Sequence, residues 1–461
     1  MELLAINWSS VGLKVAQLIL SLSILVILHE FGHYITARWF KCRVEKFYLF
    51  FDPWFSLVKK KIGDTVYGIG WLPLGGYVKI SGMIDESMDK ETMKLPPQPW
   101  EFRSKPAWQR LIIMMGGVTV NVILAFIIYA GILMVWGEDR IPNRSVKNGV
   151  WVTDSLMYEI GLRDGDKIMA VNNDSIAYFE EIPKKILFSG GGHINIVRNG
   201  KDTDIVIPRS LIGQLVEKKK SRGRLFMPRI PAIMGQFDKD DTSRAKKAGL
   251  QFMDKIVKVD SLPIQFLDQA AAYFNTKRNQ QVLLTVDRKG SEIQLPVQLN
   301  EEGKMNPTLL GNKQYDSLGM FDIVHTDYGF FEAFPAGFNL AITSLKDYID
   351  QFKLILSPST GAYKGVGGFK AMGSVFSGSE WDWQHFWSIT AFFSIVLAFM
   401  NLLPIPALDG GHVLFTLIEM ITGRKPSEKF LEYAQITGMV ILVALMLYAN
   451  GNDWFGWGRG K

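Results

Sequence analysis

A chain of 461 residues is longer than one hydrophobic core usually serves, so we expect roughly two to four folding units. Charged residues make up 21% of the chain, which excludes a protein that consists only of membrane spans. The net charge of +6 is spread along the chain without a concentrated basic stripe, and we therefore exclude nucleic acid as a partner.

Four apolar stretches are long enough to cross a bilayer as helices, which takes about 20 residues each. They cover approximately residues 11–34, 111–136, 386–408 and 430–449. The first stretch has no small-residue cleavage site and is followed by Arg38, Lys41 and Arg43, so we interpret it as a retained span and not as a signal peptide. The pattern predicts a polytopic α-helical membrane protein embedded in a lipid bilayer.

The first span contains a His-Glu-x-x-His motif at residues 29–33. On a helix, His29 and His33 share one face and can bind the same metal ion, while Glu30 can act as general base on water. Because Cys42 is the only cysteine, any metal must be held by histidine and carboxylate. Ionisable residues inside a span are costly unless they pair, face a cavity or bind a metal. We predict a zinc site here; polar side chains that merely pack between helices are the alternative.

Charge asymmetry predicts the orientation of the spans. Residues 38–110 carry more Lys and Arg than Asp and Glu, and the loop after the third span carries Arg424, Lys425 and Lys429. By the positive-inside rule both segments face the cytoplasm, so both termini and the long block at residues 137–385 lie outside. The first and third spans then run in the same direction.

The block between the second and third spans contains a repeat. Residues 161–176 align without gaps on residues 249–264 and share Gly-Leu, Asp-Lys-Ile, a Val and a final Ile. A period of this length indicates two tandem small domains, and β-rich stretches around polar turns predict that both are mainly β. The pattern Gly-Leu-x-x-x-Asp-Lys-Ile resembles the core of PDZ domains, which bind extended chain ends at a sheet edge. Peptide ligands are therefore expected; spacer domains without a ligand are the alternative.

Residues 331–356 place apolar side chains at helical spacing among charged ones. This predicts one or two amphipathic helices on the membrane surface or beneath the PDZ pair, with an ordinary packing helix as the alternative. Five regions follow: a membrane region at 1–136, PDZ domains at 137–210 and 211–305, a connecting region at 306–385, and a second membrane region at 386–461.

The third span supplies the candidate for a third zinc ligand, which a catalytic site with two histidines requires. Asp409 ends the apolar run about as far along the third span as His29 lies along the first, so both fall toward the cytoplasmic side. Helix-breaking residues surround it, and irregular backbone at membrane depth is tolerated where it lines a cavity; these are Pro404, Pro406, Gly410 and Gly411. We predict Asp409 as the ligand and keep His412 as a less favoured competitor.

Taken in order, these motifs resemble the bacterial site-2 proteases, close to the RseP type with two PDZ domains. The likeness rests on the His-Glu-x-x-His motif, on Asn-x-x-Pro-x-Pro-x-Leu-Asp-Gly at residues 401–410, and on Pro-Leu-Gly-Gly-Tyr-Val-Lys at residues 73–79. It covers nearly the whole chain, and it departs at Val118 and Phe369, where the family usually has proline.

The resemblance implies a role for several further residues. Gly75, Gly76 and Tyr77 would belong to a re-entrant β-hairpin whose edge strand holds an unwound substrate. Asn401, in the same motif as Pro404 and Pro406, would contact the substrate backbone, with a role in joining helices as the alternative. Asn121 is expected to support the site or to join helices.

The resemblance also implies an activity and a location. The chain would be an intramembrane zinc protease of the bacterial inner membrane with periplasmic PDZ domains that exclude bulky substrates. Its substrates would be single-pass membrane proteins, namely anti-sigma factors already trimmed outside and remnant signal peptides. A zinc transporter is a rival, but the spans hold no further acidic residue before Asp409. A non-catalytic membrane PDZ adaptor is a second rival function, but an adaptor would not require the general base Glu30.

Overall fold

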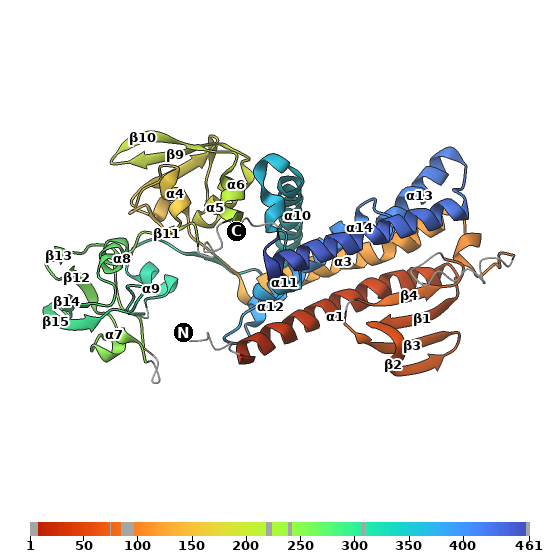
Figure 1. The fold of residues 1–461 in the computed structure, drawn as a ribbon, viewed down its shortest axis with the longest axis horizontal. Helices are drawn as coiled ribbons and strands as arrows, with labels where there is room; N and C mark the ends of the chain where they lie inside the picture. The colour runs from red at the N-terminus through yellow and green to blue at the C-terminus, as the bar shows by residue number, and fades with distance from the viewer. Residues whose placement is uncertain are drawn as a thin grey trace. The chain divides into compact units, whose positions relative to one another are not determined.

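The computed structural model describes residues 8–73, 75–83, 96–217, 224–237, 242–306 and 309–457. The chain divides into two compact units (Figure 1). Unit 1 comprises residues 1–137, 327–353 and 364–461, and unit 2 comprises residues 138–326 and 354–363.

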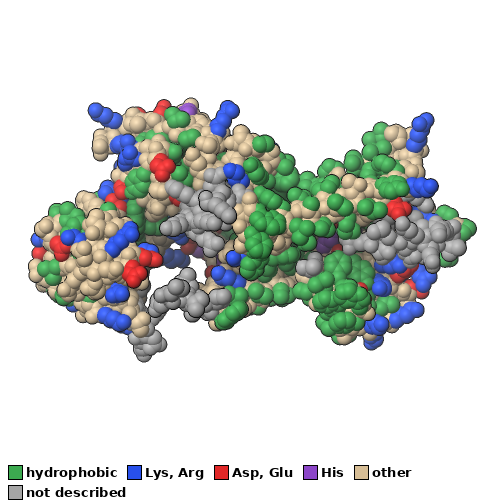
Figure 2. Space-filling view, viewed as in Figure 1, with side chains coloured by type: hydrophobic (Ala, Val, Ile, Leu, Met, Phe, Trp, Pro, Cys, Tyr) green, Lys and Arg blue, Asp and Glu red, His purple; other side chains and the backbone are tan. Residues whose placement is uncertain are grey.

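Unit 1 is built on long apolar helices. Its helices are α1 (Trp8–Trp39), α3 (Ala107–Trp136), most of α10 (Phe330–Leu356), α11 (Phe369–Ser374), α12 (Trp383–Leu402), α13 (Asp409–Thr422) and α14 (Glu428–Phe455). Of these, α1, α3, α12 and α14 are long and apolar enough to cross a membrane. Hydrophobic side chains cover much of the helical surface in Figure 2, as expected for helices that face lipid. The predicted architecture of four membrane-spanning helices with β-rich regions is confirmed.

The third span is shorter than predicted. Helix α12 ends at Leu402 and not near residue 408, because Pro404 and Pro406 cannot continue the hydrogen-bond ladder of a helix. A six-residue break follows, and Asp409 then begins α13. Gly410 and Gly411 were predicted to break the helix, but they lie inside the first turn of α13.

Small residues bring α1 and α3 into close contact. A Cβ atom on Gly32 would come within 3 Å of the Gly116 backbone, and one on Gly116 within 3 Å of the Gly32 backbone. Helices in membranes pack through such small residues and through interhelical hydrogen bonds. One such bond joins α12 to α3, because the Ser394 hydroxyl donates to the Asn121 carbonyl at 2.7 Å. The result is a tight three-helix core around the middle of α3.

A four-stranded sheet follows α1. Its strands are β1 (Val44–Leu49), β2 (Phe51–Ile62), β3 (Thr65–Leu72) and β4 (Tyr77–Ile80), in the order β2-β3-β1-β4. The order corrects the predicted hairpin at residues 73–79, because β4 pairs with β1 and not with its neighbour in sequence, β3. Gly75 and Gly76 lead into β4, and the adjoining Leu74 lies outside the described residues. β4 is therefore an edge strand, as predicted, but in a larger sheet.

The amphipathic segment forms a single long helix, α10. Within unit 1, Ala341 packs in a buried cluster with Ala125 and Tyr129 of α3, and the Ser344 hydroxyl donates to the Tyr129 hydroxyl at 3.1 Å. A Cβ atom on Gly337 would come within 3 Å of Ala130. The inner face of α10 thus packs against a membrane helix, whereas Phe330, Phe331 and Phe338 are exposed. The packing alternative is supported by these contacts, and a position on the membrane surface stays a prediction.

Unit 2 consists of short strands and helices. They are β5 (Glu138–Arg140), β6 (Val150–Val152), α4 (Ser155–Glu159), β7 (Lys167–Val171), β8 (Asp174–Ser175), α5 (Ile182–Phe188), β9 (Gly192–Arg198), β10 (Lys201–Ile207), α6 (Leu211–Glu217), β11 (Phe226–Pro228), α7 (Arg244–Lys247), β12 (Lys255–Val259), β13 (Leu262–Pro263), α8 (Leu267–Thr276), β14 (Gln281–Arg288), β15 (Ser291–Gln298), α9 (Asn312–Ser317) and β16 (Val324–Thr326).

The sequence repeat appears as a repeated fold in unit 2. Two four-stranded sheets have matching orders, β10-β9-β7-β8 and β13-β12-β14-β15, each with one helix inserted after the second strand. Each sheet has its own hydrophobic core. The PDZ assignment of these two modules stays a prediction.

The packing in unit 2 crosses the predicted domain boundaries. Leu211 and Phe226 belong to the first core, and β11 pairs with β6 of the same core. Tyr315 and Phe321, expected in a connecting region, also complete the first core. The sequence repeat includes only the strands that the two modules share. It therefore could not predict which flanking segments complete each hydrophobic core.

Candidate metal centre and active site

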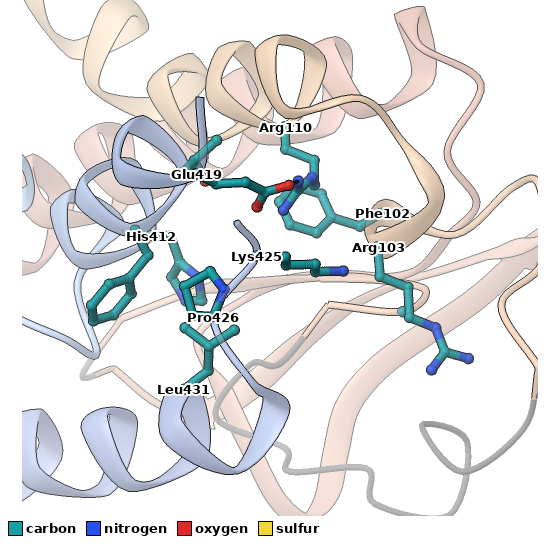
Figure 3. Close-up of a pocket in the computed structure, with 11 residues that line it drawn as sticks. Phe102, Arg103, Arg110, His412, Glu419, Lys425, Pro426 and Leu431 are labelled. Carbon is teal, nitrogen blue, oxygen red and sulfur yellow. Dashed lines mark hydrogen bonds and ion pairs between the residues drawn. The ribbon is translucent and has the colours of Figure 1, made fainter. Parts of the chain in front are cut away.

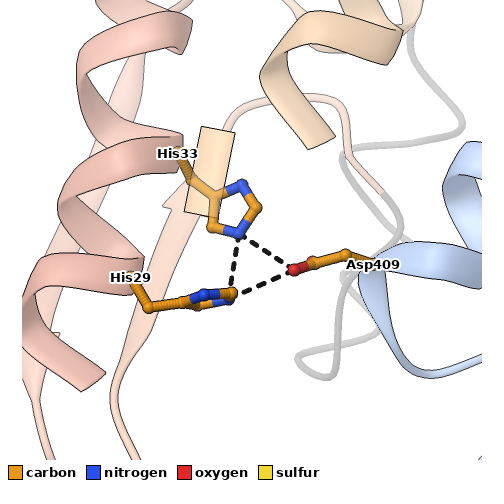
Figure 4. A group of neighbouring side chains, drawn as sticks. All are labelled: His29, His33 and Asp409. Carbon is orange, nitrogen blue, oxygen red and sulfur yellow. Dashed lines mark hydrogen bonds and ion pairs between the residues drawn. The ribbon is translucent and has the colours of Figure 1, made fainter. Parts of the chain in front are cut away.

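Three predicted zinc ligands converge in unit 1. His29 and His33 project from one face of α1, and Asp409 reaches them from the start of α13 (Figure 4). The Oδ2 atom of Asp409 lies 3.1 Å from Nε2 of His29 and 3.2 Å from Nε2 of His33, and the two Nε2 atoms are 3.2 Å apart. Both imidazoles are buried. The break after α12 is what turns the Asp409 carboxylate toward α1.

The backbone of α3 sets the orientation of His33. The Nδ1 atom of His33 lies 2.9 Å from the carbonyl oxygen of Ile113, and an acceptor at that place requires the proton on Nδ1. The lone pair of Nε2 then points at His29 and Asp409. Such a bond from the second ring nitrogen is the usual support of a histidine that binds a metal.

The side chain of Asn121, on α3, orients the His29 ring through its Nδ1 atom. Its side-chain amide lies 3.1 Å from Nδ1 of His29, the residue is fully buried, and its Oδ1 is a buried oxygen without a hydrogen-bond partner. Rotation of the amide by 180° exchanges the positions of its nitrogen and oxygen. Oδ1 then accepts a hydrogen bond from the Nδ1–H group of His29, and the lone pair of Nε2 faces Asp409. The orphaned oxygen therefore favours the tautomer in which His29 can bind a metal through Nε2.

The donor set fits zinc. In tetrahedral zinc sites bonds of about 2.0–2.1 Å place ligand atoms about 3.3 Å apart, close to the 3.1–3.2 Å found here. Two imidazole nitrogens and one carboxylate oxygen are typical of catalytic zinc, which keeps a fourth position open. These three residues are the only such cluster of His, Cys, Asp and Glu found among the described residues.

Gly117 makes room for the two imidazoles. A Cβ atom at this position of α3 would lie within 3 Å of the rings of both His29 and His33. The sequence showed a Gly-Gly pair in the second span but not which of the two would meet the histidines. Gly116 contacts the backbone of α1, whereas Gly117 contacts the candidate ligands.

Glu30 and the edge strand β4 meet at one cavity. A hollow of about 550 Å³ is lined by His29, Glu30, His33 and Asp409 together with Gly76, Tyr77 and Val78. The backbone N–H of Val78 hydrogen bonds to the Glu30 carboxylate, and a Cβ atom on Gly76 would lie 3.4 Å from Cγ of Glu30. The candidate base, the candidate ligands and an edge strand thus face the same space.

A profile of Peptidase family M50 matches residues 17–445 of the chain. The chain belongs to this family. The regulator of sigma-E protease RseP of Escherichia coli is 28% identical over 461 residues, covering 95% of this chain and 97% of the relative. A protein of Rickettsia conorii whose assigned name is that of a zinc metalloprotease is 28% identical over 448 residues, covering 96% of this chain and 98% of the relative. The prediction of a zinc metalloprotease related to RseP is confirmed.

The Asn-x-x-Pro-x-Pro motif at residues 401–406 lies beside the candidate metal centre of this M50 peptidase. The amide Nδ2 of Asn401 is 3.2 Å from Nε2 of His29. Pro404 and Pro406 shape the break between α12 and α13, and Pro406 is pressed against Gly438 of α14, where a Cβ atom would clash with its carbonyl. Ala407 has a φ of 83°, which is unfavourable for a residue with a Cβ atom. A strained, tightly packed turn therefore precedes Asp409.

His412 lies away from the three-residue cluster. It lines a separate small hollow with Phe415 and Lys425 (Figure 3). Beside this hollow, Nη2 of Arg110 donates to Oε1 of Glu419 at 2.5 Å and joins α3 to α13. The cluster holds Asp409 and not His412, so the geometry favours the first of the two candidates.

Proposed function

We propose that this zinc metalloprotease cuts peptide bonds within or near the membrane-spanning segments of single-pass membrane proteins. The observation that carries the proposal is the position of Glu30, His29 and His33 on an apolar helix long enough to span a membrane, next to a cavity with an exposed strand edge. An aqueous protease would have no reason to place these residues on such a helix, because ionisable groups in lipid are costly.

The residues of the cavity have separate tasks in the proposed reaction. His29, His33 and Asp409 hold zinc, which supplies Lewis-acid chemistry when bound. Glu30, held by the Val78 N–H, accepts a proton from the attacking water and returns it to the leaving amine.

Strand β4 supports the capture of an extended substrate. A helix has no free backbone groups in its interior, so a membrane-spanning substrate must unwind before hydrolysis. Among the described strands, β4 pairs only with β1, so no described strand covers its second edge and an added strand could pair there beside the Val78–Glu30 hydrogen bond. The proximity of the Asn401 amide to His29 supports a proposed contact with the backbone of a segment bound there. Tyr77 on β4 and Gly75 and Gly76 before it belong to this proposed binding edge.

The substrate class follows from relatives and not from geometry. Two relatives, from Escherichia coli and Salmonella typhi, carry the name regulator of sigma-E protease. We therefore propose anti-sigma factors trimmed outside the membrane, and remnant signal peptides, as substrates of a bacterial inner-membrane enzyme that cuts near the cytoplasmic side. The two β modules of unit 2 would be periplasmic PDZ domains that bind peptides or exclude substrates with intact outer domains.

The Glu30→Gln variant tests the proposed chemistry. The full-length protein would be purified and reconstituted with a single-pass substrate that lacks its outer domain. Glu30→Gln should retain zinc and lower cleavage by about a thousandfold or more, because water activation loses its base. Glu301→Gln, in an exposed loop of unit 2, is the matched control and should cleave normally. Persisting cleavage by Glu30→Gln would contradict the mechanism.

A deletion tests the filter role of the β modules. Removal of residues 150–300 should permit cleavage of a substrate that keeps its outer domain, while cleavage of the trimmed substrate continues. Unchanged discrimination between the two substrates would rule out the filter.

A further inference from the structure

A basic hollow lies at the end of α1 that follows the metal-centre motif. It has a volume of about 500 Å³ and is lined by Arg38, Lys41, Cys42, Arg43, Asp64 and Trp100. Three cations and one carboxylate give the lining a charge of +2 (3 − 1). Cys42 forms part of the floor and is buried, and burial raises the pKa of its thiol, so the cysteine is neutral there. The hollow is separate from the zinc-site cavity, with which it shares no lining residue.

The three cations have no bonding partner among the described residues. The side chains of Arg38, Lys41 and Arg43 form no hydrogen bond or ion pair there. The carbonyls of Thr36, Ala37 and Arg38 near the end of α1 accept backbone N–H groups and do not use these side chains as caps. Lys41 N donates to Arg38 O at 3.0 Å, and Cys42 N donates to Ala37 O at 2.8 Å.

Lys41 occupies a position that would suit glycine better. Its φ is 59°, the left-handed conformation in which helix ends of this type usually have glycine. A side chain with a Cβ atom is disfavoured there by about 1 kcal/mol. The backbone of this turn is stabilised by the two hydrogen bonds above and gains nothing from the lysine side chain. The exposed side chain is therefore available to a group outside the turn.

Exposed tryptophans mark the same end of the helices as a membrane boundary. Trp39 ends α1, Trp108 begins α3, and Trp100 lines the hollow; they are 77%, 49% and 45% exposed. The backbone N–H of Arg43 donates to the carbonyl of Trp100 at 3.0 Å, so Trp100 is held against the basic turn. Tryptophan gathers at the headgroup level of membranes. The ligand of the hollow should therefore come from the lipid headgroup layer.

We propose that this hollow binds the phosphate of an anionic phospholipid. Two arginines offer forked donors that suit phosphate oxygens, and Lys41 adds a point charge. The positive-inside rule explains cations near the end of a span. It does not explain three cations that surround one hollow beside an interfacial tryptophan and have no partner among the described residues. The bound headgroup would anchor the turn between α1 and β1, the strand to which the edge strand β4 is paired.

Lipid binding by charge-matched variants tests the proposal. The full-length protein would be placed in mixed micelles containing a phosphatidylcholine and a phosphatidylglycerol, and bound lipid would be measured by native mass spectrometry. The variant Arg38→Gln/Lys41→Gly/Arg43→Gln should lower phosphatidylglycerol binding by about a hundredfold, at about fivefold per cation. Lys59→Gln/Lys60→Gln/Lys61→Gln removes the same charge from exposed positions of β2 outside the hollow, and it should change binding less than twofold.

Two further arms separate the alternatives. Lys41→Gly alone should lower lipid binding about fivefold while its thermal stability is unchanged or higher, which excludes misfolding as the cause. Inorganic phosphate should not displace the lipid; if it binds the hollow as tightly as the lipid does, the lipid assignment is overturned. An equal loss in both triple variants, or equal binding of phosphatidylcholine, would also overturn the proposal, because the charge would then act diffusely.

Discussion

Two kinds of carboxylate occur in this protein, and they differ in their partners: buried aspartates in unit 2 and the half-buried Asp409 in unit 1. In each repeat of unit 2, a buried aspartate is satisfied by the chain itself. Asp166 receives two hydrogen bonds from Arg198, both of 2.7 Å, and Asp254 receives bonds of 2.7 and 2.6 Å from Arg288. These bonds raise the pKa of both arginines. In unit 1, Asp409 instead faces two imidazole nitrogens and no Lys or Arg partner within the described residues.

The comparison shows how a structural carboxylate differs from a ligand. The aspartates of unit 2 stand at equivalent positions of the repeat, and each also accepts a backbone N–H, from Arg163 or Gln251. Their charge is fully compensated. The cluster at Asp409 brings three acceptor atoms together, an arrangement that needs a cation to be stable.

The largest expected effect is that of Asp409→Asn. Loss of the ligand should lower proteolysis by about a thousandfold and release zinc, because several kcal/mol of metal-dependent stabilisation are lost. Zinc content by mass spectrometry and cleavage of a reconstituted substrate would check this. Full zinc occupancy in the variant would contradict the assignment of Asp409 as a metal ligand.

Gly117→Ala should weaken zinc binding by about 10- to 100-fold, because the new methyl group forces the His29 and His33 rings from their positions. Gly131→Ala on the same helix is the control, since no other group lies within 4 Å of a Cβ atom there. Its zinc affinity should match that of the unchanged protein. Equal affinities of all three proteins, measured by competition with a chelator, would show that the packing at Gly117 is loose.

Asp166→Asn should lower the stability of unit 2 without changing the zinc content. It leaves the Arg198 guanidinium without its carboxylate and should lower the stability of unit 2 by about 2 kcal/mol, a value reduced because Arg198 is partly exposed. Zinc content should stay unchanged. Hydrogen exchange in unit 2 and zinc analysis of the same sample would check both parts; loss of zinc would show that this aspartate is not purely structural.

Asn121→Leu should give the smallest effect on the metal centre. It removes the group that orients His29 while keeping a similar volume, so zinc affinity should fall by about tenfold. Asn121→Asp retains an acceptor for the Nδ1 proton and should restore most of the affinity. If both variants bind zinc equally poorly, Asn121 acts through helix packing and not through the tautomer of His29.

Much of the metal centre could be predicted from sequence because its motifs are local. Helical periodicity places His29 and His33 on one face without any knowledge of the fold. The pairing with Asp409 required only the direction and length of two spans. The roles of Gly117 and Ile113 could not be assigned in this way, and Asn121 was expected to support the site without its partner His29 being known, because these contacts depend on the depth and rotation of α3 against α1.

The sequence by itself determined which helices could span a membrane, the two histidines and the candidate base on one of them, and the repeat in unit 2. These follow from hydrophobicity and from the fixed periods of helix and strand. Only the tertiary structure decided that β4 pairs with β1, that Leu211 and Tyr315 complete the first core, and that α13 begins at Asp409. Strand pairing and packing join residues far apart in the chain, and no local pattern encodes which distant partner is chosen.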